Sequence, residues 1–388
     1  MTYNFRQFLK TTFLSFFNVK NTNARLTRKR VSFIALFYLI WPVYALFIRL
    51  SFILDDILFP VNKEQTLEKP LFILGNFRSG TTFLHRLLAK DHQNFTCLNT
   101  WEIFLAPAII QRKFFFLLDK IDSLFGNPIK KAFVRFDQNT LGNVDIHKVG
   151  FFVPEEDENL MLHMWSSFFV QFMFPFWEDL PNYEYFDRAI GPKTRNKLMQ
   201  FYRRCIQRHL YAHGGKLHLI SKNPSFSPKI KSLIESIPEA RIIYLVREPH
   251  EMLPSTISWL SYAWNRFGDP IEKYPYLNRT IAFTKYWYDH PLEVLSAYDP
   301  KKYLIIKYAD LIHETQNTIQ AIYQYFGYKL NGEFSDFVSE ISQNEKQRKS
   351  QHVYSFQDMG LSLHDIYQTY QHIYERFDFS LPTQDQSI

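Results

Sequence analysis

Residues 70–88 read PLFILGNFRSGTTFLHRLL, and this stretch decides the fold. Its opening run PLFILG is apolar and ends in Gly75, which is typical of a short buried strand in a parallel sheet. Apolar residues then recur at helical spacing over residues 81–90. Between these two segments, GNFRSGTT meets the phosphate-loop pattern G-x-x-x-x-G-K-[ST] at every fixed position except the lysine, where Thr81 stands. The stretch therefore predicts a strand, an anion-binding loop and a helix.

Later segments extend this unit into a full α/β fold. Apolar runs predict three further strands, at 216–221, 240–246 and 302–308. Helical patterns surround and separate them, at 192–213, 227–236, 251–263, 279–297 and 309–326. Strands that alternate with helices predict a parallel sheet with right-handed crossovers. We therefore expect a P-loop-like three-layer sandwich over residues 69–380, with a central parallel sheet flanked by helices, followed by a polar tail at 381–388.

Charge and cysteine content exclude some classes of protein. The chain has a formal net charge of +7, but residues 1–54 hold eight Lys or Arg and no acid, so the remainder sums to −1. A nearly neutral domain with a basic leader does not predict a nucleic-acid-binding face. Cys97 and Cys205 cannot form a disulfide framework and match no zinc-site spacing. We expect neither a nucleic-acid partner nor a metal.

The leader, residues 1–68, contains a membrane-associating segment. Residues 31–48 carry no charge, which is just long enough for a transmembrane helix. Three alternatives stay open: a spanning helix, a helical hairpin in one leaflet, and a helix packed on the domain. We expect contact with a membrane surface through residues 1–60. Basic residues before the run favour a cytosolic N-terminus and the cytoplasmic face, or the Golgi lumen in a eukaryote.

Cations gather where the predicted strands end. Lys222 follows the strand at 216–221, Arg247 follows the strand at 240–246, and Arg78 lies in the loop. Ligands of parallel sheets bind beyond these carboxyl ends, and like charges gathered there need an anion. ATP- and GTP-binding loops use the missing lysine and hold Mg²⁺. The site therefore favours a nucleotide whose reactive end carries less charge than a triphosphate and needs no magnesium.

A mixed phosphate–sulfate anhydride fits that description, and the chain resembles the sulfotransferases that use 3′-phosphoadenylyl sulfate (PAPS), in the branch with a GxxRSGTT loop. PLFILGNFRSGTTFLHRLLAKD (70–91) resembles the family's 5′-phosphosulfate loop and helix. SIPEARIIYLVREPHEMLPSTISW (236–259) resembles its 3′-phosphate element. Further resemblance lies in the segments 219–230, 305–328 and 352–362.

The resemblance implies roles for individual residues. The 5′-phosphosulfate would be held by Arg78, Ser79, Gly80, Thr81 and Thr82. The 3′-phosphate would be held by Arg247 and Ser255, with Arg348 or Lys349 closing over it. Lys222 would lie near the bridging oxygen and stabilise charge on the departing nucleotide.

The implied reaction is in-line transfer of a sulfuryl group to a hydroxyl or amine of a carbohydrate, lipid or small-molecule acceptor. A general base must take the acceptor's proton. The candidates are Glu102, Glu156 in the acidic cluster 155–158, and His163, although four adjacent acids are also typical of a solvated turn. The aromatic-rich segment 100–190 would form the acceptor-binding insertion.

Two other classes of protein stay open from the sequence. A nucleotide or small-molecule kinase with the same loop would depend on Mg²⁺ and bind ATP. A non-catalytic, membrane-attached nucleotide-binding module would keep only a degenerate loop. The pair Arg247 and Ser255 argues against the second, because a degenerate loop would have no need of another phosphate site.

Overall fold

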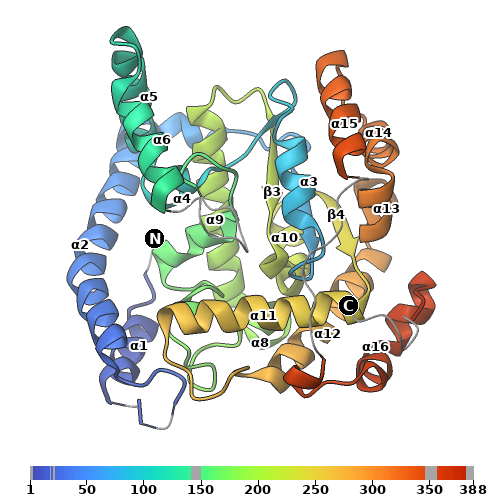
Figure 1. Cartoon of the computed structure of the whole chain (residues 1–388). Coiled ribbons are helices and arrows are strands. Elements are labelled where there is room, and N and C mark those ends of the chain that lie inside the picture. The colour runs from blue at the N-terminus through green and yellow to red at the C-terminus, as the bar shows by residue number, and fades with distance from the viewer. Residues whose placement is uncertain (1–2, 18, 21, 141–149, 346–355, 382–388) are drawn as a thin grey trace.

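Figure 1 shows the computed structural model of the chain, which describes all residues except 1–2, 18, 21, 141–149, 346–355 and 382–388. At its centre five parallel strands form one sheet in the order β2-β3-β1-β4-β5. The prediction of an α/β fold with a central parallel sheet is confirmed. The strands are β1 (Leu71–Gly75), β2 (Phe95–Thr96), β3 (His218–Lys222), β4 (Arg241–Val246) and β5 (Tyr303–Lys307).

Helices cover both faces of the sheet, as the alternation of buried side chains along each strand requires. On one face, Leu71 and Ile73 pack against α3 (Thr81–Leu88), α13 (Tyr308–His313), α14 (Thr315–Phe326) and α15 (Gly332–Glu345). On the other face, Phe72 and Leu74 pack with α9 (Pro192–Ala212), α10 (Ile230–Ser236), α11 (Pro249–Phe267), α12 (Leu277–Ser296) and α16 (Leu363–Phe377). These are the three expected layers.

The order in which strands are added to the sheet reverses at β1. After β1 the chain moves outward to β2, returns to β3 beside β1, and then crosses to β4 on the other side of β1. The loop after β1 therefore lies between the ends of β3 and β4, where ligands of such sheets bind.

The structure differs from the predicted elements in three places. The two-residue strand β2 was not predicted, and the expected helix at 309–326 is two helices, α13 and α14, which meet at Glu314 with non-helical φ −125° and ψ 41°. The expected helix at 227–236 begins only at Ile230, after a 3₁₀ segment at Pro224–Lys229.

The segment between β2 and α9 is irregular, as expected. It contains short helices α4 (Thr100–Phe104), α7 (Val170–Met173) and α8 (Phe186–Ala189), and a 3₁₀ segment at Asp157–Met164. Two longer helices, α5 (Ile109–Leu124) and α6 (Pro128–Thr140), form a hairpin that projects from the body (Figure 1).

The apolar leader forms one long helix, α2 (Arg28–Leu58), preceded by α1 (Phe5–Phe17). Pro42 lies inside α2 without ending it, so a helical hairpin within this segment is excluded. Buried charged side chains fix both ends of α2 to the domain: Arg30 donates to the Met173 carbonyl at 2.6 Å, and Asp55 pairs with Arg208 at 3.1 Å. The helix lies along the side of the molecule over its whole length (Figure 1).

Candidate active site

The loop after β1 contains three residues with positive φ, two of them glycines and one an arginine. Gly75 has φ 151°, Gly80 has φ 84°, and Arg78 has φ 64°, a left-handed conformation that is unusual for a residue with a Cβ. A Cβ on Gly75 would meet the Leu245 carbonyl at 2.6 Å, so β4 passes too close for any other residue. Such strain is common where a backbone is shaped for a ligand.

Neighbouring elements hold the loop in place. The Ser227 hydroxyl donates to the Gly75 carbonyl at 2.8 Å, and the Gly75 amide donates to the same hydroxyl at 3.2 Å. The Asn76 side chain donates to the Thr284 carbonyl of α12 at 3.1 Å. These hydrogen bonds fix the conformation of the loop without a ligand.

The two predicted phosphate corners are in direct contact. Arg78 Nε donates to the Ser255 hydroxyl at 2.9 Å, and Arg247 Nη1 donates to the Arg78 carbonyl at 2.8 Å. Arg247 also pairs with Glu251 at 2.8 Å and stacks 4.2 Å from the centre of the Tyr308 ring. The structure thus brings Arg78, Arg247 and Ser255 together at one rim of the sheet, where β1 and β4 end side by side.

The loop also offers features that suit a phosphate or sulfate group. The Ser79 hydroxyl is buried and has no hydrogen-bond partner among the residues that the structure describes. Thr81 and Thr82 open α3, whose N-terminus directs its free amide groups and positive dipole end at the loop. Thr81 is buried, and Thr82 is partly exposed. These residues fit a 5′-phosphosulfate bound without a lysine.

Lys222 lies beside the loop, paired with Glu156. Its side chain is only 1% exposed, and Nζ donates to Glu156 Oε1 at 2.6 Å. Because side chains alternate along a strand, Lys222 emerges on the same face as Ile220, the face covered by α3. Burial raises the pKa of Glu156, while the Lys222 ammonium opposes that rise. The pair places a cation and a proton acceptor within one hydrogen bond of each other.

A second acid fixes this arrangement. Asp157 Oδ1 accepts from the hydroxyls of Ser221 (2.9 Å) and Tyr202 (3.0 Å) and from the side-chain amide of Asn223. Burial raises the pKa of Asp157 to about 6, against the lowering effect of these donors. The side-chain carbonyl of Asn223 accepts from the Glu158 amide at 2.9 Å. Asn223 therefore ties the acidic segment to the end of β3.

The acidic cluster is not a solvated turn. Glu156, Asp157 and Glu158 are all buried, and Glu158 forms a buried ion pair with Lys229. The sequence placed Asn223 at the end of a predicted strand but assigned no role to it or to Lys229. The run SKNPSFSPK (221–229) carries both, and polar residues directly after a buried strand are the signal that could have found them.

Glu102 lies in a different network from Glu156. Its Oε1 accepts from His213 (2.8 Å) and contacts His209 Nδ1 (3.1 Å), and it lies 3.4 Å from Arg112 Nε. Its Oε2 accepts from the Asn99 amide at 3.1 Å, which caps α4. Burial acts to raise its pKa, but these cationic and hydrogen-bonding partners hold the pKa well below its ordinary value.

Glu102, His209 and His213 have the spacing of a possible metal site, since one ligand atom of each lies within 4.8 Å of the others. The Arg112 guanidinium is directed at the same carboxylate oxygen and is fully buried. A fixed positive charge there disfavours a divalent cation, and the cluster is better explained as a buried charge network.

The remaining predicted residues lie elsewhere. His163 Nε2 donates to the Ile103 carbonyl at 2.8 Å, and its ring packs against Tyr44 and Phe52 of α2. Burial lowers its pKa to about 4. The structure does not bring His163 to Lys222 or to the loop. Arg348 lies outside the described residues.

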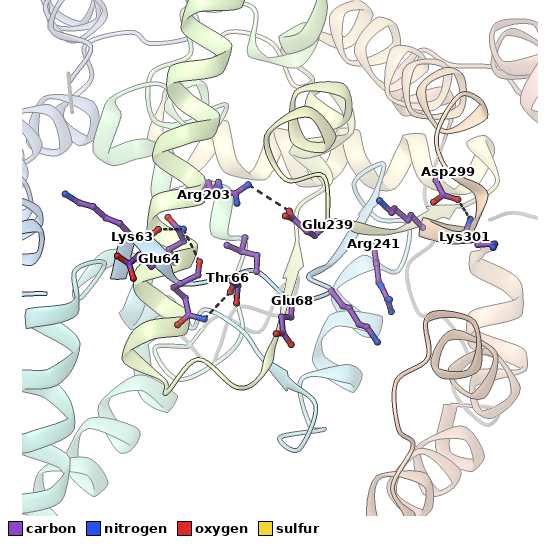
Figure 2. A pocket seen from close by; sticks show the side chains of 14 residues that line it. Lys63, Glu64, Thr66, Glu68, Arg203, Glu239, Arg241, Asp299 and Lys301 are labelled. Carbon is purple, nitrogen blue, oxygen red and sulfur yellow. Dashed lines mark hydrogen bonds and ion pairs between the residues drawn. The ribbon is translucent and has the colours of Figure 1, made fainter. Parts of the chain in front are cut away.

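A separate pocket lies at the opposite end of the strands, where the strands begin (Figure 2). It has a volume of about 680 Å³ and is lined by residues that precede or begin the strands, such as Lys69, Arg241 and Lys302. Figure 2 shows both signs of charge around it, with Arg203 paired to Glu239. Its place at the amino ends of the strands separates it from the candidate active site.

Comparison with known proteins identifies the class. A profile of the sulfotransferase family matches residues 70–332, which is more than half of the chain. The chain belongs to the sulfotransferase family, as the resemblance in its sequence predicted.

Among curated relatives, the omega-hydroxy-beta-dihydromenaquinone-9 sulfotransferase Stf3 of Mycobacterium tuberculosis is 28% identical over 280 residues, which cover 71% of this chain and 66% of the relative. The chain thus spans slightly less than two thirds of that relative. The 3-alpha-hydroxysteroid sulfotransferase of Cavia porcellus is 30% identical over 137 residues, covering 34% of this chain and 43% of the relative.

Solved structures share the fold. The sulfotransferase STF9 of Mycobacterium avium superposes with a TM-score of 0.71 at 17% identity, covering 98% of each chain. STF1 of Mycobacterium tuberculosis superposes with a TM-score of 0.64 at 18% identity, covering 95% of this chain and 92% of that structure.

Proposed function

We propose that this protein transfers a sulfuryl group from PAPS to a hydroxyl group of a lipid or apolar small molecule at a membrane surface. The observation that carries the proposal is the direct contact between the two phosphate corners, from Arg78 to Ser255 at 2.9 Å and from Arg247 to the Arg78 carbonyl at 2.8 Å. One nucleotide with a phosphosulfate at its 5′ end and a phosphate at its 3′ position can reach both corners.

The donor would be held by the chain's own dipoles and cations. The loop residues Ser79, Gly80, Thr81 and Thr82, with Arg78, would bind the 5′-phosphosulfate through amide groups, hydroxyls and the guanidinium. Arg247 and Ser255 would bind the 3′-phosphate. PAPS supplies an activated sulfur, whose bond to the bridging oxygen breaks as the acceptor oxygen attacks from the opposite side.

Lys222 and Glu156 would carry the proton and the charge. Glu156 takes the proton of the acceptor hydroxyl, which neutralises the carboxylate that holds Lys222 in its ion pair. The Lys222 ammonium is then free to stabilise the negative charge on the bridging oxygen. The two events reinforce each other, because protonation of Glu156 removes the partner that competes for Lys222. We propose Glu156, and not Glu102 or His163, as the base.

The relatives favour an apolar acceptor. Two of them are named for a hydroxylated menaquinone derivative and for a hydroxysteroid. The exposed face of α2 supports an acceptor that resides in a membrane. That helix includes an 18-residue window with a mean hydropathy of 2.2, of which only 11% is buried.

We propose that α1 and α2 lie on a lipid monolayer and do not span it. Arg30 and Asp55 are fixed to the domain and stand about 40 Å apart along a helix that rises 1.5 Å per residue. A spanning helix would carry the domain surface into the hydrocarbon with it. Apart from the buried Arg30, the seven other basic residues of 1–54 suit the anionic lipids of a cytoplasmic leaflet.

Sulfur-35-labelled PAPS, incubated with the protein, EDTA and a lipid extract, tests the reaction. The proposal expects a labelled, organic-soluble product that forms without divalent metal and disappears with Glu156→Gln. In a separate reaction, labelled ATP with Mg²⁺ replaces PAPS and EDTA. A phosphorylated product there, with no product from PAPS, would support the kinase alternative instead.

A further inference from the structure

The α5–α6 hairpin, residues 109–136, exposes apolar side chains where a water-facing hairpin would carry charge. At its tip Leu124 is 77% exposed, Phe125 75% and Ile129 68%. Further exposed apolar residues continue along the two helices: Phe114, Leu117, Leu118, Ile121 and Phe136. Single exposed apolar residues are normal, but a contiguous set marks a surface that binds another apolar phase.

The tip is a built turn with a fixed shape. Both Asp122 carboxylate oxygens accept backbone amides at the start of α6, from Ile129 at 3.0 Å and from Lys130 at 2.9 Å. Lys130 pairs back to Asp119 at 2.9 Å. The first backbone amides of α6 and the Asp122 carboxylate are thus hydrogen-bonded within the hairpin, while the apolar side chains at its tip are exposed.

The hairpin is also fixed relative to α2. The two oxygens of Asp55, near the end of α2, accept the first backbone amides of α5, from Ile109 at 2.7 Å and from Ile110 at 3.0 Å. Figure 1 shows α5 and α6 projecting beyond the end of α2 on the same side of the molecule. The helix α2 exposes apolar side chains too, among them Leu39 at 73% and Val43 at 71%, so both elements that meet at Asp55 carry exposed apolar residues.

We propose that the α5–α6 hairpin is a second membrane-inserting element, which places its Leu124–Phe125 tip in the same anionic phospholipid monolayer that carries α2. This inference rests on the proposed membrane contact of α2, and it adds a second contact made by residues of α5 and α6. Two attachment points, one along α2 and one at the tip, would fix the orientation of the enzyme on the membrane. Attachment through α2 alone would let the whole protein rotate about the axis of that helix.

Charge favours a lipid over a second copy of the chain. Arg112 and Asp122 are buried, which leaves five Lys or Arg and one acid exposed in residues 109–136. Residues 1–54 carry seven Lys or Arg besides the buried Arg30, and no acid. A twofold dimer through this face would set the same basic surface against itself, which costs energy. An anionic monolayer offers hydrocarbon to the apolar residues and counter-charge to the basic ones.

Flotation of the full-length protein on phosphatidylcholine vesicles, with and without phosphatidylglycerol, tests the inference. The double variant Leu124→Asp with Phe125→Asp should bind anionic vesicles about tenfold more weakly or worse, because two apolar side chains leave the hydrocarbon. Both positions are exposed, so folding should be unchanged. The matched control is Tyr325→Asp, a 45% exposed aromatic on α14 at the far side of the molecule, and it should bind like the wild type.

Two results would overturn the inference. One is a tip variant that binds vesicles as well as the wild type. The other is a wild-type dimer in solution that the tip variant converts to a monomer, with vesicle binding unchanged. Binding of 3′,5′-bisphosphoadenosine, measured on the same samples, reports on the proposed function separately, because the tip lies outside the donor site.

Discussion

Replacing Lys222 by methionine removes the buried cation that faces Glu156 at 2.6 Å. Removing one partner of a buried ion pair costs about 3–5 kcal/mol, because the remaining charge is left without compensation. The Lys222→Met variant should therefore lose about that much free energy of unfolding. Glu156→Gln should lose a similar amount, and the double variant should lose clearly less than the sum of the two.

Activity should not follow the same pattern. If Lys222 stabilises the leaving group, Lys222→Met should lower kcat by roughly 10²–10³, the effect of one lost charge-stabilising donor. The double variant should regain stability without regaining kcat. Residues that act as a unit show this kind of non-additivity in rate.

The assay combines urea unfolding, followed by tryptophan fluorescence, with PAPS-dependent turnover scaled to the folded fraction. Arg208→Met is the matched control, since it leaves Asp55 buried without its partner in a pair whose side chains are both fully buried. It should cost a similar free energy of unfolding while kcat on a soluble acceptor stays near the wild-type value. A Lys222→Met protein that is destabilised but turns over normally would refute the role of Lys222.

Three further predictions concern other residues. Gly80→Ala should abolish donor binding and cost at least about 1–2 kcal/mol, because Gly80 has φ 84° and a Cβ would meet Tyr308 at 2.6 Å; calorimetry with 3′,5′-bisphosphoadenosine measures the first effect and urea unfolding the second. Glu102→Gln should lower the free energy of unfolding by about 3–5 kcal/mol, measured in urea, because the buried carboxylate pairs with Arg112 and His209. The kcat per folded molecule should stay unchanged, because Glu102 lies in a different network from Lys222. Lost turnover in well-folded protein would contradict that placement. Burial raises the pKa of Asp157 from 3.8 to about 6, so the native state keeps a proton that the unfolded chain releases. The free energy of unfolding should therefore fall by about 2 kcal/mol between pH 4 and pH 6, and Asp157→Asn should flatten that slope in urea titrations.

Local motifs made the first strand, loop and helix predictable. The signals for β1, the loop and α3 lie within twenty residues of one another, and the apolar run of β4 is followed directly by Arg247. The contact between the two corners followed from the rule that parallel strands end at one rim. In contrast, β2 has only two residues, too few to give a periodic pattern.

The burial of the acidic cluster could not be read from the sequence, because its partners come from β3 and the segment after it. Glu156 pairs with a residue 66 positions later, and Glu158 with one 71 positions later. Glu102 did carry a local signal: Asn99 and Glu102 have the spacing of a capping box, which favours a structural role. The histidines that surround Glu102 come from α9, more than 100 positions later.

We infer that two adjacent strand–helix corners bind two anionic groups of one adenosine nucleotide without metal. Titration calorimetry in EDTA, with 3′,5′-bisphosphoadenosine and with adenosine 5′-phosphosulfate, tests it most directly. We expect Arg247→Ala to weaken the bisphosphate about 10- to 100-fold, the effect of losing one charge-assisted contact. The 5′-phosphosulfate should weaken much less, because that ligand is affected only through the lost hydrogen bond to the Arg78 carbonyl. Equal weakening of both nucleotides, or binding of ATP with Mg²⁺ and none of the bisphosphate, would contradict it.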